Sequence, residues 1–127
     1  MNATKTSVDG IKMDSKLEAY FYKSIKPHIQ EGKATWKPPK VILQKGYTDW
    51  NGKKVRAIGW DPDCLFPGRA YVDPKGHATP SFKLRLKLYK FTHDLPVVLL
   101  KDKTQINTFV LLLRADNWEE IYRLFRA

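Results

Sequence analysis

Four ionisable residues of this 127-residue chain have the types and the spacing of a metal-dependent hydrolytic centre. Asp63 and Asp73 lie in the segment DPDCLFPGRAYVDPKG, where Lys75 follows the second carboxylate, and Glu18 lies upstream in the segment SKLE. Two carboxylates that converge on one point form a hard-oxygen site suited to Mg²⁺ or Mn²⁺. A lysine on the same face of a strand can reach a water or a phosphate held by that metal. The expected chemistry is therefore phosphodiester hydrolysis.

Each of these residues also has a simpler interpretation, which the sequence leaves open. Glu18 fits the last position of an S-x-x-E capping box, where its carboxylate would cap a helix. Asp61 alternates with Asp63 along the chain, so either can be the metal-facing carboxylate. Asp73 and Lys75 can form a surface ion pair worth under about 1 kcal/mol. Spacing alone does not choose between a metal site and these structural roles.

Three neighbours of the carboxylates bear on the same site. Pro74 cannot donate to a sheet ladder, which predicts an edge or a bulge, but its carbonyl remains an acceptable ligand for a hard cation. His77 can contact a phosphate or assist proton transfer. Cys64 is the single cysteine, which excludes an internal disulfide and a cysteine metal cluster.

The elements that must position these residues follow an α/β pattern. A tight turn at Pro67-Gly68 joins two expected strands, and this hairpin would bring Asp63 and Asp73 together across neighbouring strands. The expected order is a helix at 13–30, strands at 41–44, 55–66 and 69–75, a helix from 79, strands at 96–100 and 109–113, and a helix from 116.

These elements predict a central mixed five-stranded sheet flanked by helices. Residues 13–127 are expected to form a single domain, and residues 1–12 a flexible basic arm. No apolar run approaches the roughly 18 residues of a membrane span. Together with the single cysteine, this favours a cytoplasmic protein with no membrane partner.

Charge is the strongest compositional signal. The chain has 23 Lys and Arg against 13 Asp and Glu, a net charge of +10. An excess of this size favours a nucleic-acid partner, although a run of charge is also the usual solvated face of a protein. Basic residues flank the acidic segment on both sides and are expected to contact the DNA backbone together with His77: Lys53, Lys54, Arg56, Lys83, Arg85, Lys87 and Lys90.

The segments SKLE at 15–18 and PDCLFPGRAYVDPKG at 62–76 carry a resemblance to a known family. They resemble the PD-(D/E)xK nuclease superfamily, and within it most closely the phage endonuclease I group of Holliday-junction resolvases. The chain is also similar to small phage proteins with an S-K-L-E…D…D-V-K-G pattern followed by a basic F-K-L-x helix. The likeness runs from about Asp14 to Leu100.

The resemblance implies a restriction-endonuclease-like fold and a role for each site residue. Asp63, Asp73 and the Pro74 carbonyl would bind Mg²⁺, for which Mn²⁺ would substitute. Glu18 would complete a second metal position or orient the attacking water. Lys75 would position the nucleophile or stabilise charge on the phosphate.

The same resemblance implies a structure-specific endonuclease that cuts branched DNA, in the host bacterial cytoplasm if the gene is a phage gene. Because a four-way junction needs two symmetric cuts, a homodimer follows, with chain exchange through the Pro-rich bridge at 34–40. The alternatives are a nicking, mismatch-directed or restriction-like endonuclease of the same superfamily, and a non-catalytic DNA- or partner-binding protein on a nuclease-like fold.

Overall fold

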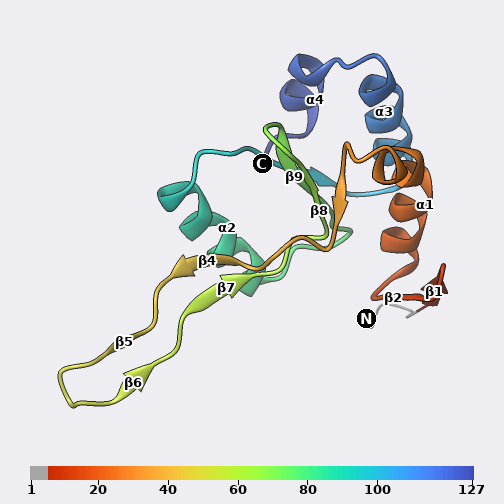
Figure 1. The fold of residues 1–127 in the computed structure, drawn as a ribbon. Helices are drawn as coiled ribbons and strands as arrows, with labels where there is room; N and C mark the ends of the chain where they lie inside the picture. The colour runs from red at the N-terminus through yellow and green to blue at the C-terminus, as the bar shows by residue number, and fades with distance from the viewer. Residues whose placement is uncertain (1–5) are drawn as a thin grey trace.

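The computed structural model describes residues 6–127 as an α/β arrangement of helices around a small mixed sheet (Figure 1). The elements are β1 (Thr6–Val8), β2 (Ile11–Met13), α1 (Lys16–Gln30), β3 (Thr35–Trp36), β4 (Val41–Gln44), β5 (Tyr47–Thr48), β6 (Lys54–Val55), β7 (Ile58–Trp60), β8 (Cys64–Phe66), β9 (Ala70–Pro74), α2 (Pro80–Thr92), β10 (Val97–Leu100), α3 (Lys103–Arg114) and α4 (Trp118–Phe125).

The central sheet has four strands in the order β10-β9-β8-β3. Strand β10 runs parallel to β9, whereas β8 runs antiparallel to both β9 and β3, so the sheet is mixed. The parallel pair requires a crossover between β9 and β10, and α2 supplies it. The predicted mixed α/β class is therefore confirmed, and the hairpin predicted around Pro67-Gly68 is the β8–β9 pair.

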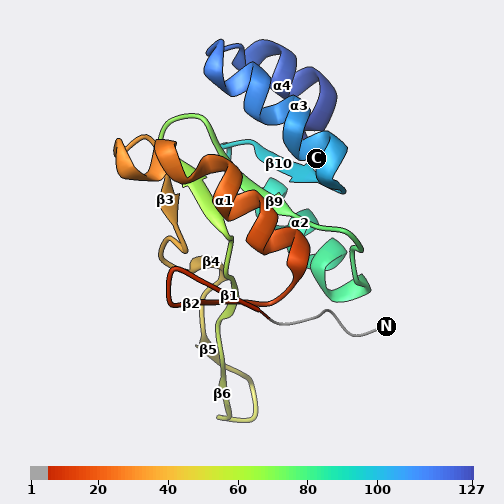
Figure 2. The same ribbon diagram turned by 90° about the vertical axis from the view of Figure 1, so that its right-hand side faces the viewer.

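Both faces of the sheet are covered, which explains the continuous apolar run at the predicted strand 96–100. Val98 and Leu100 lie in one core with α1, α3 and α4. Val97 and Leu99 belong to a second core that includes Tyr89 of α2. Figures 1 and 2 show α1 and α3 together on one side of the sheet, with α2 on the other.

The prediction of a strand at 109–113 is wrong, and the central sheet has four strands instead of the five expected. The strand predicted at 41–44 also lies outside this sheet, as β4, whereas β3 joins it from the segment 34–40 that was expected to be a bridge. Residues 109–113 belong to α3, which begins at the N-cap Asp102, whose side chain accepts a hydrogen bond from the backbone N–H of Gln105. Phe109 is fully buried and packs against aromatic rings of α1, β8 and α4. The apolar run at 109–113 continues past the buried face of α3 to the exposed Leu111, and such a run fits a buried strand as well as a helix, so the run was ambiguous.

The strand expected at 55–66 is also divided. Its first half belongs to residues 41–60, a two-stranded β-ribbon that we call the ribbon, in which β4 pairs with β7 and β5 with β6. Only β8 enters the central sheet. Both views show the β5–β6 end of the ribbon projecting away from the helices (Figures 1 and 2).

The N-terminal residues differ from the expected flexible arm in the part that the structure describes. Residues 6–13 form the antiparallel hairpin β1–β2. Its last residue, Met13, is fully buried against α1, and Asp9 forms an ion pair of 2.7 Å with Lys26 of that helix. Residues 1–5 of the predicted arm lie outside the described residues.

The starts of α1 and α2 agree with the sequence, whereas α4, predicted from 116, is capped by Asn117. Ser15 caps α1, and Thr79 caps α2, where its Oγ1 accepts from the backbone N–H of Phe82 at 3.1 Å and Pro80 takes the first helical position. The basic segment FKLRLKLYKF is thus helical, as predicted. Within the described residues, no helix is both long enough and apolar enough to cross a membrane.

Candidate active site

The two aspartates meet where β8 begins and β9 ends. The antiparallel register pairs Cys64 with Val72, so the next step places Asp63 opposite Asp73. The backbone N–H of Asp63 donates to Asp73 Oδ1 at 2.9 Å. Two residues that are ten positions apart in the sequence are thereby in direct contact.

Lys75 extends the same edge of β9. Its ammonium lies 3.4 Å from Asp73 Oδ2 and 4.5 Å from the ring centroid of Phe82, at the start of α2. Its backbone N–H donates to the carbonyl of Leu100 at 2.8 Å, which ties this end of β9 to β10. Because Asp73 is only 1% exposed, the pair is not the surface ion pair that the sequence also allowed.

Glu18 reaches the aspartates from the first turn of α1 and is 3% exposed. Its backbone N–H donates to Ser15 Oγ at 3.0 Å, and its Oε2 accepts from the backbone N–H of Asp14 at 2.6 Å. One carboxylate oxygen therefore serves the helix start, but its donor is Asp14, one residue before the N-cap Ser15, so the capping box is not formed in its usual reciprocal form. The other, Oε1, accepts from the ammonium of Lys37, so Glu18 both serves the helix start and is linked through Lys37 to Asp63.

Lys37 is the site residue that sequence reasoning missed. Its ammonium donates to Glu18 Oε1 and to Asp63 Oδ1, and its backbone N–H donates to the carbonyl of Asp63 at 2.7 Å. Lys37 directly follows β3 with a φ of 50°, a left-handed conformation that is uncommon outside glycine. No local pattern around residue 37 indicates this role, because both partners come from distant parts of the chain.

The electrostatics of the site are those of buried carboxylates in close contact. Burial, followed by the charge of Asp73, raises the pKa of Asp63 to about 6, against the opposing effect of Lys37. Burial also raises the pKa of Glu18, and the charge of Asp63 adds to this. For Lys37, burial acts to lower the pKa, but the hydrogen bonds that its ammonium donates to Asp63 and Glu18 outweigh it and raise the pKa above its usual value. The site therefore favours a cation.

The donor chemistry fits a hard divalent cation, although the residues do not surround one as they stand. Over residues 6–127, no three His, Cys, Asp or Glu side chains are grouped closely enough to hold a metal ion. Instead, Lys37 separates Glu18 from Asp63, and the Asp63 amide contacts Asp73. The positively charged Lys37 ammonium thus lies between Glu18 and Asp63, where a metal ion bound to both carboxylates would have to lie.

The structure distinguishes Asp63 from Asp61, the alternative candidate for the metal-facing carboxylate. The side chain of Asp61 is 73% exposed and lies 3.6 Å from Lys40, whereas that of Asp63 is 16% exposed and joins the cluster. His77 is exposed in the connection between β9 and α2. Asp61 is thus a surface residue, and the buried acids of this region are Glu18 and Asp73, with Asp63 beside them.

The expected DNA contacts lie on two surfaces. The stripe on α2 comprises Lys83, Lys87 and Lys90, which line a hollow of about 280 Å³ together with Leu86. Arg85 lies off this stripe, and its Nε donates to the carbonyl of Gly59 at 2.9 Å, which fastens α2 to the ribbon. The other surface is on the ribbon itself and carries Lys53, Lys54 and Arg56, all exposed.

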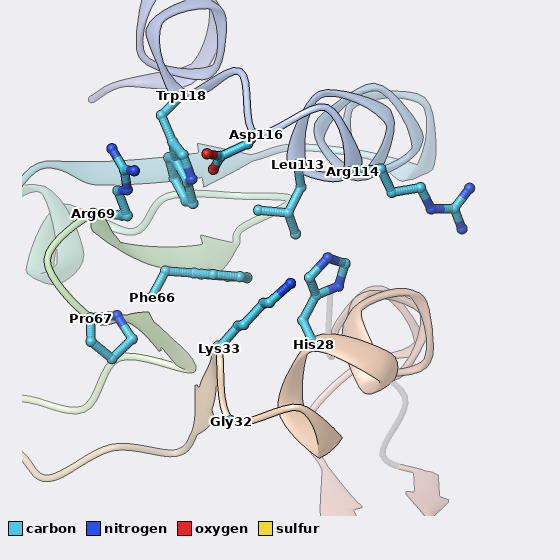
Figure 3. A pocket seen from close by; sticks show the side chains of 10 residues that line it. All are labelled: His28, Gly32, Lys33, Phe66, Pro67, Arg69, Leu113, Arg114, Asp116 and Trp118. Atoms are coloured by element: carbon cyan, nitrogen blue, oxygen red, sulfur yellow. The ribbon is translucent and has the colours of Figure 1, made fainter.

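A larger hollow of about 530 Å³ lies elsewhere, at the C-terminal end of α1 (Figure 3). Figure 3 shows Leu113 pointing into it from α3 and Arg114 pointing away. Its lining residue His28 is ten residues beyond Glu18, about 15 Å along the helix. Among its lining residues, Asp116 is the single acid, so the hollow lacks the paired carboxylates of the site.

Comparison with known proteins identifies a family. A family described as "Protein of unknown function (DUF1064)" matches residues 1–104, which include every residue of the candidate site. No curated protein and no solved structure matches the chain.

Proposed function

The chain belongs to the DUF1064 family of proteins of unknown function, and from its site we propose that it is a metal-dependent DNA endonuclease with a restriction-endonuclease-like fold. One observation carries the proposal. Glu18, Asp63 and Asp73 come from three segments of the chain, yet a chain of contacts connects them: Lys37 joins Glu18 to Asp63, and the Asp63 amide contacts Asp73. Lys75 lies at the edge of this group, next to Asp73. Buried carboxylates next to a lysine are the groups that metal-assisted phosphodiester hydrolysis requires.

Asp63, Asp73 and the carbonyl of Pro74 would hold Mg²⁺, and Glu18 would complete the ligand set; Mn²⁺ offers the same preference for oxygen donors. When bound, the ion supplies a water of lowered pKa and stabilises the departing oxygen. Pro74 is the last residue of β9 and is buried in register with Leu100. The proline is therefore accommodated within a paired strand beside the two aspartates.

Lys75 acts on the substrate. Its contacts with Asp73 and with the Phe82 ring hold the ammonium beside the carboxylates while leaving its side chain 30% exposed. From there it donates to a phosphate oxygen or to the attacking water, which stabilises the negative charge that develops during cleavage.

Lys37 neutralises the carboxylates before the ion binds. It lies between Glu18 and Asp63, where a cation shared by these two residues would have to lie. Loading the site therefore requires Lys37 to leave, and its 41% exposed side chain can swing toward solvent.

DNA is the expected substrate because both basic surfaces adjoin the site in a chain with a net charge of +10. Helix α2, which carries the stripe, begins beside Lys75, and the ribbon ends three residues before Asp63. Branched DNA is the preferred form. Two symmetric cuts at a four-way junction need two active sites, so the protein would act as a homodimer.

A labelled four-way junction with Mg²⁺ tests the proposal. We expect wild-type protein to cut it, and Asp73→Asn and Lys75→Ala to slow cutting by about a hundredfold or more while junction binding survives. Asp61→Asn is the matched control, because it removes an exposed carboxylate two residues from Asp63, and it should cut normally. Flap, nicked and linear substrates in the same assay compare the branched-DNA preference with nicking or restriction-like activity.

A non-catalytic DNA-binding protein is the second candidate, and the Lys37 bridge favours it, since this bridge satisfies two carboxylates without a metal. That candidate predicts tight, salt-sensitive DNA binding with no cutting in Mg²⁺ or Mn²⁺, and the same binding by Asp73→Asn. Such a result would refute the endonuclease.

A further inference from the structure

The end of the ribbon presents an unusual side chain. Trp50 is 92% exposed, whereas Trp60 and Trp118 are 7% and 5% exposed. Exposing a tryptophan leaves a large apolar surface in water, and aromatic residues exposed in this way are typical of binding sites. Trp50 contributes nothing to either side of the central sheet, so folding gives no reason for its position.

The turn that carries Trp50 is well defined. Asp49 Oδ1 accepts from the backbone N–H groups of Asn51 and Lys53 at 2.8 and 2.9 Å, and the Asp49 N–H donates to the Lys53 carbonyl at 2.8 Å. Gly52 supplies the left-handed residue of the turn, with a φ of 79°. The ring is therefore held on an ordered turn, so less conformational entropy is lost when a partner binds.

The surroundings of Trp50 are cationic. Residues 41–60 contain four basic side chains, Lys45, Lys53, Lys54 and Arg56, and one acid, Asp49. The four basic residues are exposed, and within residues 6–127 none of them forms an ion pair. The carboxylate of Asp49 is already occupied by the turn. The ribbon therefore suits a polyanion.

A hollow of about 410 Å³ on the ribbon adds to this surface. It is lined by Gly46, Tyr47, Thr48, Lys54, Val55 and Arg56. Tyr47 is 52% exposed and offers a second aromatic ring next to two cations. At Gly46, an added Cβ would lie 3.0 Å from the carbonyl oxygen of Val55, so glycine allows the close strand approach here.

We propose that the ribbon binds nucleic acid at positions where bases are unstacked, with Trp50 stacking on an exposed base and the four cations contacting the flanking phosphates. Aromatic rings and a basic surface are together the features that bind unpaired strands. Unpaired or unstacked bases occur at branch points, so the ribbon would direct the protein to such sites. This inference rests on the proposed function for the choice of DNA.

The connection between ribbon and site supports a joint role. The returning strand β7 ends at Trp60, and Asp63 follows after two residues. An extended chain advances roughly 3.3 Å per residue, so the five residues from Lys45 to Asp49 carry the turn on the order of 15 Å beyond β4. A base bound at Trp50 would thus be separated along the DNA from the phosphodiester that is cleaved.

The test measures binding in EDTA, where cleavage is absent. Fluorescence anisotropy compares labelled duplex, gapped duplex and four-way junction. For Trp50→Ala we expect about five- to hundredfold weaker binding to gapped and junction DNA and a much smaller loss on intact duplex. Trp50→Phe should keep most of the affinity. Leu111→Ala is the control, because Leu111 is a 65% exposed apolar residue on α3, which carries neither basic surface, and it should bind all three DNAs like the wild type.

A direct readout comes from the tryptophan itself. Trp50 should account for most of the fluorescence that acrylamide quenches, and gapped DNA should protect it. The inference fails if Trp50→Ala binds gapped DNA as tightly as the wild type, or if it changes the sedimentation coefficient of the free protein, which would place a second copy on the ribbon. A loss of gapped-DNA binding in a protein that never cuts DNA would refute the endonuclease and leave this inference standing.

Discussion

The carboxylate site buries most of its charged groups, whereas the ribbon exposes its charged and aromatic groups to solvent. In the site, Glu18 and Asp73 are almost fully buried, and their charges are balanced by Lys37 and Lys75. On the ribbon, Trp50 and the four cations lie in solvent, and the cations have no acidic partner within the described chain. Burial changes the proton affinity of groups and suits chemistry, whereas exposure leaves groups free to bind. Under the proposed function, the carboxylate site would carry out catalysis and the ribbon would recognise the substrate.

The largest expected effect is on the free energy of unfolding, which should depend on a buried core residue and hardly at all on the exposed ribbon. Phe109 is fully buried among the rings of Phe21, Phe66 and Trp118. Phe109→Ala should lower the free energy of unfolding by about 3–5 kcal/mol, whereas Trp50→Ala should change it by less than about 0.5 kcal/mol. Urea denaturation followed by circular dichroism measures both. A large loss for Trp50→Ala would show that the ribbon packs against another surface.

The second prediction uses the pH dependence of the site. The pKa of Asp63 is raised from 3.8 to about 6 in the folded protein, so between these values the folded state keeps a proton that the unfolded state has lost. The contribution of Asp63 to stability therefore falls as pH rises from about 4 to about 6, by on the order of 3 kcal/mol, and is constant above.

Asp63→Asn removes this dependence. The difference in unfolding free energy between variant and wild type should change across this pH range, whereas the same difference for Asp61→Asn should not. Urea denaturation at five pH values between 4 and 7 gives both differences. Parallel curves for the wild type and Asp63→Asn would contradict the buried, charge-coupled site.

The smallest effect concerns Lys37. In EDTA, Lys37→Met should lower the unfolding free energy by about 1 kcal/mol, a modest value because the side chain is 41% exposed. Mn²⁺ should then raise the melting temperature of the variant more than that of the wild type, because the ion no longer competes with the ammonium. Lys40→Met, which removes the partner of Asp61, is the control. Equal Mn²⁺ shifts in all three proteins would show that Lys37 does not hold the cation position.

Part of the structure was predictable because its signals are local. Ser15 and Thr79 begin helices as predicted, since a cap depends on residues within one turn. The apolar run at 109–113 was wrongly predicted to be a strand because its length and composition also suit a buried strand. A correct assignment was available from Asp102 with Gln105, a capping pattern, and from the helical spacing of Ile106, Phe109, Val110 and Leu113, all buried.

The sequence by itself determined the α/β class, the β8–β9 hairpin and the contact between Asp63 and Asp73, because a tight turn brings residues ten positions apart into register. Only the tertiary structure placed Lys37 between Glu18 and Asp63 and set the ribbon apart from the sheet. Local patterns specify backbone hydrogen bonds and the faces that are buried. They do not specify which distant segments share a core, and that packing decides where the buried charges of this site meet.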